Sequence, residues 1–263
     1  MAADGAQTTY SFDPAASTFG RGQTAYFWEF GRRLVALVQT APGELILDVA
    51  AGTGAVSVPL ADAGVRVMAA DVSLPMLSQL EVGTRRIARL GGSALALPFP
   101  DHTFDVVTCG FGVAFFPDLS VALCEMRRVL RPNGRIGFTW WLYEERTPWV
   151  AAFELSNPLL AADVARTWER AQELANPSLL TTLAVEAGFT ECAAHRLEVP
   201  WGGATFDEFF ERCLRGWRGR GLDEAGVSGL REGLTAVAAR YMDASGHLRY
   251  PLHGVAVTGI SPQ

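Results

Sequence analysis

The feature that most constrains the fold is an apolar strand that runs directly into a glycine turn. The run reads Leu45-Ile46-Leu47-Asp48-Val49-Ala50-Ala51-Gly52-Thr53-Gly54. A continuous apolar strand is typical of a parallel sheet that is covered on both faces. Glycine allows the backbone to turn tightly and to come close to a ligand. The run therefore predicts an α/β fold in which strand 45–49 carries a ligand-binding turn at the edge of a parallel sheet.

A second strand, 65–70, ends in an acid that is also informative. This acid, Asp71, follows Gly54 by 17 positions. In nucleoside-binding α/β folds, an acid at this place accepts hydrogen bonds from the ribose. The dinucleotide fingerprint G-x-G-x-x-G is absent, because the acid Asp48 precedes the glycines and the third glycine is missing. The turn therefore predicts a nucleoside cofactor that is not a dinucleotide.

The rest of the chain alternates between helix and strand patterns. We expect an N-terminal helix within 23–40, helices at 54–63, 73–82, 119–130 and 178–187, and strands at 86–91, 104–109, 134–141, 190–199 and 253–260. This alternation predicts a parallel sheet with right-handed crossovers. The segments 142–176 and 203–243 have a different, helical pattern and are expected to be insertions. We expect a single domain, 1–263, with residues 1–40 as an N-terminal helical cap.

Composition argues against several classes of protein. A net charge of −6 and a pI near 5.3 argue against nucleic-acid binding, which usually needs a basic surface. No apolar run reaches the ~20 residues that span a bilayer, and the N-terminus lacks a signal-peptide pattern, so we expect a cytoplasmic protein without a membrane partner. The cysteines lack C-x-x-C spacing, so neither a metal site nor a disulfide framework is expected. They are Cys109, Cys124, Cys192 and Cys213.

Motifs further along the chain occur in the order found in one enzyme family. They are Ala94-Leu95-Ala96-Leu97-Pro98-Phe99-Pro100-Asp101, Phe104-Asp105-Val106-Val107, Arg127-Arg128-Val129-Leu130-Arg131-Pro132-Asn133-Gly134-Arg135 and Glu186-Ala187-Gly188-Phe189. With the turn at 48–54, they resemble the class I S-adenosylmethionine-dependent methyltransferases, in the small-molecule subgroup related to ubiquinone and menaquinone biosynthesis. The resemblance implies a Rossmann-like, seven-stranded, mostly parallel sheet with an antiparallel last strand and helices on both faces. It also implies S-adenosylmethionine as the cofactor.

The resemblance places the cofactor beyond the carboxyl ends of the first four strands, where open α/β sheets bind ligands. Asp71 is expected to accept from the ribose hydroxyls, Val72 and Met76 to flank the adenine, and Ser93 to stand where many relatives have an aspartate. Three alternatives remain open: Asp71 as a solvated acid, Met76 as core, and Asp48 acting only by ordering the turn. The full set of expected cofactor residues is Asp48, Ala50, Ala51, Gly52, Gly54, Asp71, Val72, Met76, Ser93, Ala94, Leu95, Cys109, Gly110 and Phe111.

Aromatic residues near the same edge of the sheet indicate what kind of molecule accepts the methyl group. The expected pocket residues are Phe12, Phe19, Tyr26, Phe115, Trp141 and Trp149, and the inserted segments 142–176 and 203–243 are expected to help bind the acceptor. Wide apolar pockets suit bulky apolar small molecules. We therefore expect methyl transfer to such a molecule, of the natural-product tailoring type, by a monomer or homodimer.

Two other functions remain open, and the catalytic residues are unknown. A protein of this fold can use bound S-adenosylmethionine for cyclisation or isomerisation without methyl transfer, or can bind it without catalysis. No Ser-His-Asp or metal-ligand pattern is present. Each of His102, His195, His247 and His253 is a minor candidate for a general base, and His253 is favoured if it points toward the ligand edge of the sheet.

Overall fold

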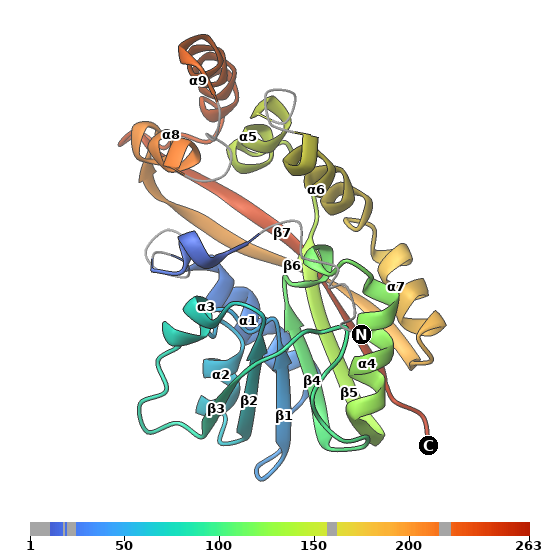
Figure 1. Cartoon of the computed structure of the whole chain (residues 1–263). Helices are drawn as coiled ribbons and strands as arrows, with labels where there is room; N and C mark the ends of the chain where they lie inside the picture. Colours follow the sequence, from blue (N-terminus) through green and yellow to red (C-terminus); the bar gives the residue numbers. More distant parts are fainter. Residues whose placement is uncertain (1–10, 18, 20–24, 157–161, 216–221) are drawn as a thin grey trace, which may run out of the picture. The chain divides into compact units, whose positions relative to one another are not determined.

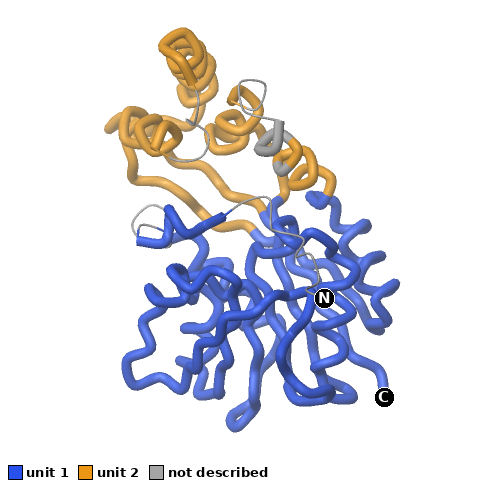
Figure 2. Tube along the Cα trace, in the orientation of Figure 1, with its two compact units in different colours: residues 1–141, 174–197, 254–263 blue, residues 142–173, 198–253 orange. Residues whose placement is uncertain are grey.

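The computed structural model describes residues 11–17, 19, 25–156, 162–215 and 222–263. The chain divides into two compact units (Figure 2). Unit 1 comprises Met1–Trp141, Leu174–Leu197 and Gly254–Gln263, and unit 2 comprises Leu142–Glu173 and Glu198–His253. The segments expected as insertions, 142–176 and 203–243, therefore supply most of unit 2.

Unit 1 is built on a seven-stranded sheet with the strand order β3-β2-β1-β4-β5-β7-β6 (Figure 1). The strands are β1 (Leu45–Val49), β2 (Arg66–Asp71), β3 (Ile87–Gly91), β4 (Phe104–Gly110), β5 (Leu130–Trp141), β6 (Thr190–Thr205) and β7 (His247–Ile260). The first five are joined by parallel pairing, whereas β7 runs antiparallel to β5. This arrangement confirms the predicted sheet.

Strand β1 has the central position that its sequence predicts. It pairs in parallel with β2 on one side and β4 on the other, and four of its five residues are buried. A strand enclosed in this way has no solvent-facing side, which explains its continuous apolar sequence. All carboxyl ends of β1 to β5 therefore meet at one edge, where the glycine turn lies.

Helices cover both faces of the unit 1 sheet (Figure 1). They are η1 (Asp13–Ala15), α1 (Tyr26–Val38), α2 (Ser57–Asp62), α3 (Leu74–Ser78), η3 (Val113–Phe115), α4 (Leu119–Val129) and α7 (Pro177–Glu186). Helix α1 packs closely on β5, since a Cβ added at Gly137 would lie 2.3 Å from Cγ1 of Val38. The close approach of α1 therefore depends on a glycine in β5.

Two helices near the turn are shorter than expected. Helix α2 begins at Ser57 rather than at 54, because Gly54 has φ +95° and cannot be part of a right-handed helix. Helix α3 ends at Ser78 rather than at 82, and the chain then turns through Gly83 at φ +54°. The turn at the sheet edge is therefore longer than the hydrophobic pattern suggests.

Unit 2 consists of α5 (Pro148–Ser156), α6 (Ala162–Glu173), α8 (Phe206–Arg215), α9 (Glu224–Ala238) and the adjoining parts of β6 and β7. Helix α5 packs on α9, where the side chain of Leu155 lies 2.8 Å from the place of a Cβ at Gly233. Four aromatic side chains, Tyr143, Trp149, Phe153 and Trp168, form a connected cluster in this unit.

None of the described helices combines the length and apolarity needed to cross a bilayer. Within the same residues, no group of three or more histidine, cysteine, aspartate or glutamate side chains is placed to hold a metal ion.

Candidate functional site

The turn after β1 has an unusual backbone. Ala50, Gly52 and Gly54 have φ values of +55°, +54° and +95°, in the left-handed region that favours glycine. The N–H of Ala51 donates to the carbonyl of Ala70 at 3.1 Å, which joins the turn to β2. Alternate residues of the turn are thus left-handed, and this conformation is imposed even on an alanine.

The carboxylate of Asp71, which ends β2, holds the turn in place. One oxygen accepts from the N–H of Gly52 and the other from the N–H of Ser73, both at 2.8 Å. Burial raises the pKa of Asp71, and these two N–H donors act in the opposite direction. Each carboxylate oxygen has a second lone pair, so the group retains the capacity to accept further hydrogen bonds.

Asp48 is buried below the turn, with a relative exposure of 1%. Its carboxylate accepts from the hydroxyls of Ser57 at 2.5 Å and Thr108 at 2.9 Å. Burial raises its pKa to about 6. The side chain thereby connects β1, α2 and β4. Neither hydroxyl was predicted, although Thr108 is a polar residue in an apolar strand and is the register partner of Asp48.

Residues around Asp71 differ in exposure. Val72 and Leu74 have relative exposures of 57% and 62%, which is high for aliphatic side chains. Met76 is buried, and its Cε lies 3.3 Å from the place of a Cβ at Gly52. Met76 therefore packs beneath the turn, whereas Val72 offers an uncovered apolar surface.

The third loop, after β3, contains three of the expected residues. Ser93 is exposed, and its hydroxyl oxygen accepts from the N–H of Leu95 at 3.2 Å. Ala94 between them is buried. The serine hydroxyl is therefore engaged in the local turn, and its remaining lone pair faces no partner that the described residues provide.

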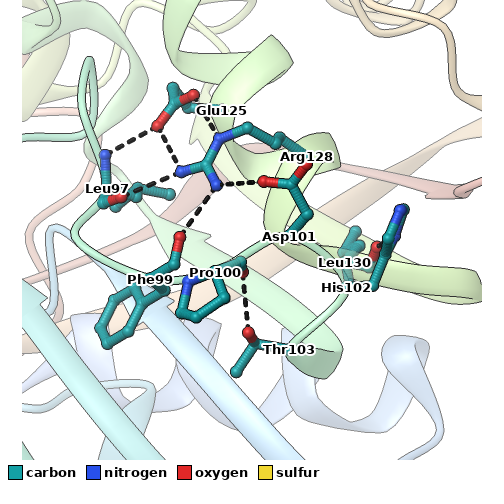
Figure 3. A network of polar contacts seen from close by, with 9 residues as sticks. All are labelled: Leu97, Phe99, Pro100, Asp101, His102, Thr103, Glu125, Arg128 and Leu130. Carbon is teal, nitrogen blue, oxygen red and sulfur yellow. Dashed lines mark hydrogen bonds and ion pairs between the residues drawn. The ribbon is translucent and has the colours of Figure 1, made fainter.

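An extended network fixes the chain that follows this loop (Figure 3). Arg128 of α4 donates to the carbonyls of Phe99 and Leu97 at 2.8 and 2.9 Å and to Asp101 at 2.7 Å. Glu125 accepts from Arg128 and from the N–H of Leu97, and the bond from Arg128 lowers its pKa. The network joins two sequence motifs, 94–101 and 127–135, which explains why they occur together.

The end of β4 turns sharply beside the glycine turn. Cys109 is buried, and burial raises the pKa of its thiol. A Cβ at Gly110 would lie 2.7 Å from Cγ2 of Val56, so this position has no room for a side chain. Phe111 follows with φ +59°, and its ring centroid lies 4.3 Å from that of Trp141.

Five of the six expected pocket residues belong to one aromatic cluster of unit 1. Phe12 contacts Phe19 and Phe115 with ring centroids 5.8 and 4.8 Å apart, and Tyr26 lies 5.7 Å from Trp141. Phe27, Phe30 and Phe111 connect these pairs. The sixth, Trp149, lies instead in the aromatic cluster of unit 2.

The N-terminal segment is joined to the site by a polar contact as well. The hydroxyl of Ser73 donates to the carboxylate of Asp13, and the same hydroxyl caps α3 by accepting from the N–H of Met76. Ser73 therefore links Asp13 and Asp71, to which its N–H donates. Sequence reasoning did not find this link, because it joins residues 60 positions apart.

A cavity of about 500 Å³ adjoins the turn. Its lining includes Phe19, Trp28 and Arg32 as well as Thr53, which stands between the two glycines. The Thr53 hydroxyl is buried, and no described residue forms a hydrogen bond with it. A buried hydroxyl of this kind is usually satisfied by a ligand or by water.

Comparisons with known proteins agree with this arrangement of the glycine turn, Asp71 and the end of β4. A family model described as a methyltransferase domain matches residues 47–138, which include the turn, Asp71 and the end of β4. The chain is 44% identical over 128 residues to a demethylmenaquinone methyltransferase of Renibacterium salmoninarum, covering 48% of this chain and 52% of that protein. It thus spans about half the length of that relative.

Two further comparisons extend over more of the chain. A demethylmenaquinone methyltransferase of Mycolicibacterium gilvum is 33% identical over 189 residues, covering 65% of this chain and 80% of that protein. The structure of a phosphoethanolamine N-methyltransferase from Haemonchus contortus, in complex with S-adenosyl-L-methionine, covers 97% of this chain and 60% of its own, with a TM-score of 0.56 and 16% identity. The structural likeness concerns the fold alone.

Proposed function

Because the chain belongs to the class I S-adenosylmethionine-dependent methyltransferases, we propose that it transfers the methyl group of this cofactor to a bulky, largely apolar small molecule. The observation that carries the proposal is the pairing of Asp71 with the glycine turn. This pairing presents a carboxylate and left-handed backbone at the same edge of the sheet. The family's cofactor needs both, for its ribose and for its methionine part.

The described residues fit the cofactor. Asp71 has lone pairs left for the two ribose hydroxyls, and charged acceptors form the stronger hydrogen bonds. The exposed side chain of Val72 offers an apolar face for the adenine. The unpartnered hydroxyl of Thr53 offers a hydrogen bond to the polar methionine end. Asp48 contributes indirectly, by holding α2 and β4 below the turn.

The acceptor is proposed to be apolar because aromatic side chains of unit 1 form a connected cluster that includes Phe111 at the end of β4. Phe12, Phe115 and Trp141 are connected through ring contacts in unit 1, and aromatic faces stabilise a nearby cation. Unit 2 is proposed to contribute acceptor contacts of its own through α5 and α9. The names of the relatives suggest demethylmenaquinone as the first acceptor to test. Apolar natural-product aromatics are the next.

The chemistry assigns a limited role to the protein. The cofactor supplies a methyl group that is already activated on a sulfonium. The residues of the chain must therefore hold the acceptor atom in line with this group and exclude water, and such positioning accounts for much of an enzyme's rate. The aromatic cluster serves both purposes, since it is rigid and apolar.

Calorimetric titration with S-adenosylmethionine tests the cofactor site. The variant D71N keeps the size of the side chain but removes its charge, and we expect it to bind more weakly by about 1.5–3 kcal/mol, the range for a hydrogen bond to a charged group. E224Q, at an exposed acid of α9, is the control and should bind as the wild type does. Equal affinities of D71N and the wild type would remove Asp71 from the ribose.

The reaction itself is tested by product analysis. Demethylmenaquinol with a short prenyl chain and a panel of apolar phenols are incubated with the wild-type protein and S-adenosylmethionine. We expect S-adenosylhomocysteine and methylated product in equal amounts with at least one acceptor. Conversion of an acceptor without release of S-adenosylhomocysteine would contradict methyl transfer.

A further inference from the structure

The N-terminal segment 11–17 contacts two separate loops of unit 1. The hydroxyl of Ser73 donates to the carboxylate of Asp13, and the ring centroid of Phe12 lies 4.8 Å from that of Phe115. Phe12 and Asp13 are neighbours in the sequence, but their partners belong to different loops. Ser73 follows β2, whereas Phe115 ends η3, which follows β4. The segment is therefore attached at two places along the same edge of the sheet.

These two places lie on opposite sides of β1. Strand β1 pairs with β2 on one side and with β4 on the other. Neighbouring strands are about 4.8 Å apart, so the ends of β2 and β4 are separated by about 10 Å, with the end of β1 between them. A segment that contacts the loops after both strands crosses the carboxyl end of β1, where the glycine turn begins. The segment 11–17 thus spans the edge that holds the turn and Asp71.

The segment is lightly packed against the rest of unit 1. Of its seven residues, Ser11, Asp13, Pro14 and Ser17 are exposed, and only Ala16 is buried. Segments with so little buried surface open at a low cost in free energy. A hydrogen bond to a carboxylate is stronger than one between neutral groups. The bond from Ser73 to Asp13 is therefore an important part of what holds the segment in place.

Ser73 also connects this attachment to the proposed ribose acceptor. Its N–H donates to Asp71 at 2.8 Å, and its hydroxyl oxygen accepts from the N–H of Met76 at 3.2 Å. One residue thus orients Asp71, caps α3 and holds Asp13. All four residues belong to unit 1, so the whole arrangement is contained within one compact unit.

We propose that residues 11–17 form a lid over the bound cofactor, and that the bond between Asp13 and Ser73 is the latch that keeps the lid closed. This inference rests on the proposed function for the identity of the cofactor. The closed lid keeps water away from the carboxyl end of β1, where the cofactor binds. The cofactor enters and leaves only while the latch is open, so the latch sets the rate at which S-adenosylhomocysteine is exchanged for S-adenosylmethionine. Asp13 acts through Ser73 and is a positioning residue.

The binding kinetics of S-adenosylhomocysteine test the latch. D13A removes the carboxylate but leaves the cap of α3 and the bond from Ser73 to Asp71. We expect the association rate and the dissociation rate both to rise about 10-fold or more, the effect of losing a hydrogen bond to a charged group, while Kd changes less than either rate. Surface plasmon resonance measures both rates.

A control variant and two outcomes make this test decisive. E224A, at an exposed acid of α9, should keep the wild-type rates. Unchanged rates in D13A would contradict the latch. A loss of affinity without faster association would also contradict it, because a merely structural contact weakens the site but does not open it.

A double-mutant comparison tests whether the two residues act as a pair. S73A removes the hydroxyl, and with it both the latch and the cap of α3. If Asp13 acts through Ser73, adding D13A to S73A should change the binding rates little further. S78A removes another hydroxyl of α3, which donates to the carbonyl of Pro75 at 2.7 Å, and should keep the wild-type rates. Additive effects of D13A and S73A would show that Asp13 acts without Ser73 and would overturn the latch.

Amide hydrogen exchange in the free protein tests the latch without any ligand. The N–H groups of Ala15 and Ala16 donate to the carbonyls of Phe12 and Asp13 at 2.9 and 3.2 Å. A helical turn this short is unstable on its own, so exchange at these two amides reports the opening of the lid. S73A alters no residue of the segment and should speed exchange at both amides about 10-fold, whereas S78A should not. Equal exchange in S73A and the wild type would contradict the latch.

These experiments separate the lid from the proposed function. If the wild type binds S-adenosylhomocysteine and D13A leaves both rates unchanged, the latch is wrong and the cofactor assignment stands. If neither S-adenosylmethionine nor S-adenosylhomocysteine binds to the wild type, the proposed function fails. In that case the lid over the cofactor fails with it, even where exchange in S73A shows that the bond holds the segment.

Discussion

Ala50 is strained by its position in the turn. It has φ +55°, which costs a side chain with a Cβ roughly 1–2 kcal/mol relative to glycine. We predict that A50G raises the free energy of unfolding by about 1 kcal/mol, since the relief of strain exceeds the entropy that glycine adds to the unfolded chain. Urea unfolding followed by tryptophan fluorescence measures the change.

Ala36 provides the comparison for this variant. It is an exposed residue in the last turn of α1, where glycine should lower the free energy of unfolding by up to about 1 kcal/mol. The two alanine-to-glycine changes thus have opposite expected signs within one unit. If A50G destabilises as much as A36G does, the left-handed conformation of Ala50 carries no strain.

Asp48 should make stability depend on pH. Its pKa rises from 3.8 to about 6 on folding, so between these values the folded state binds more protons than the unfolded state. The stability from this group is therefore greatest at low pH and decreases as pH rises from about 4 to 6, by about 3 kcal/mol at 1.36 kcal/mol per pKa unit. D48N keeps two hydrogen bonds without titrating and should remove this decrease.

Urea unfolding of D48N and the wild type at several pH values measures the difference in slope. E224Q, at an exposed acid of α9, should follow the wild type. Equal slopes for D48N and the wild type would show that Asp48 is already ionised in the folded state at pH 4. D48N should also bind S-adenosylmethionine nearly as well as the wild type, because the buried carboxylate is proposed to act only through the turn.

At the scale of elements, α1 depends on a glycine. A Cβ at Gly31 would lie 2.0 Å from the carbonyl oxygen of Ala55, just after the glycine turn. We predict that G31A lowers the free energy of unfolding by about 1–3 kcal/mol, as overpacking does, because the obstacle is backbone. It should also weaken S-adenosylmethionine binding, since Ala55 follows Gly54 directly.

A second glycine-to-alanine change tests whether the predicted loss of stability in G31A comes from its contact with Ala55. Gly229 lies within α9 and an added Cβ would meet nothing within 4 Å. G229A should therefore raise the stability by about 1 kcal/mol through helix propensity. Calorimetric melting of both variants distinguishes them, and stabilisation by G31A would mean that α1 can shift away from the turn without loss.

The elements that the sequence predicts well are those with one dominant signal. The predicted bounds of β1 and β4 agree with the structure to within one residue, because most residues of both strands are apolar. The outer part of β6 was missed because it contains Pro200, Gly202 and Gly203, residues that argue against a strand. The start of α2 was missed because the turn conformation is set by Asp71, which is distant in the sequence.

The candidate site also contains some features that the sequence predicts and others that it does not. Spacing and the family motif predict Asp71 and the glycine turn as cofactor residues, and the structure brings the two together through the bond from the N–H of Gly52 to Asp71. The partners of the acids could not be predicted: Asp48 binds Thr108, and Ser73 binds Asp13, each across 60 positions. Such contacts depend on strand register and on the path of the N-terminal segment, for which one sequence contains no periodic signal.

At the scale of the whole molecule, unit 2 is formed by two stretches of chain, and unit 1 residues precede and follow each of them in the sequence. The proposed cofactor residues all lie in unit 1, and α5, α6, α8 and α9 all lie in unit 2. The two ligands of the reaction are therefore expected to act on different parts of the chain. Amide hydrogen exchange resolves such local effects, because a bound ligand slows the opening of the residues that it contacts.

We predict that S-adenosylhomocysteine slows exchange at 50–54, 71–76, 92–95 and 109–112 and leaves α9 unchanged. An acceptor that the enzyme methylates should then slow exchange in α5 and α9 when it is added to the protein with bound S-adenosylhomocysteine. The D71N protein serves as the control for the first step, since its protection should need a higher concentration of the ligand. Protection of α9 by S-adenosylhomocysteine alone would assign unit 2 to cofactor binding, and unchanged exchange in unit 2 with both ligands would remove it from acceptor recognition.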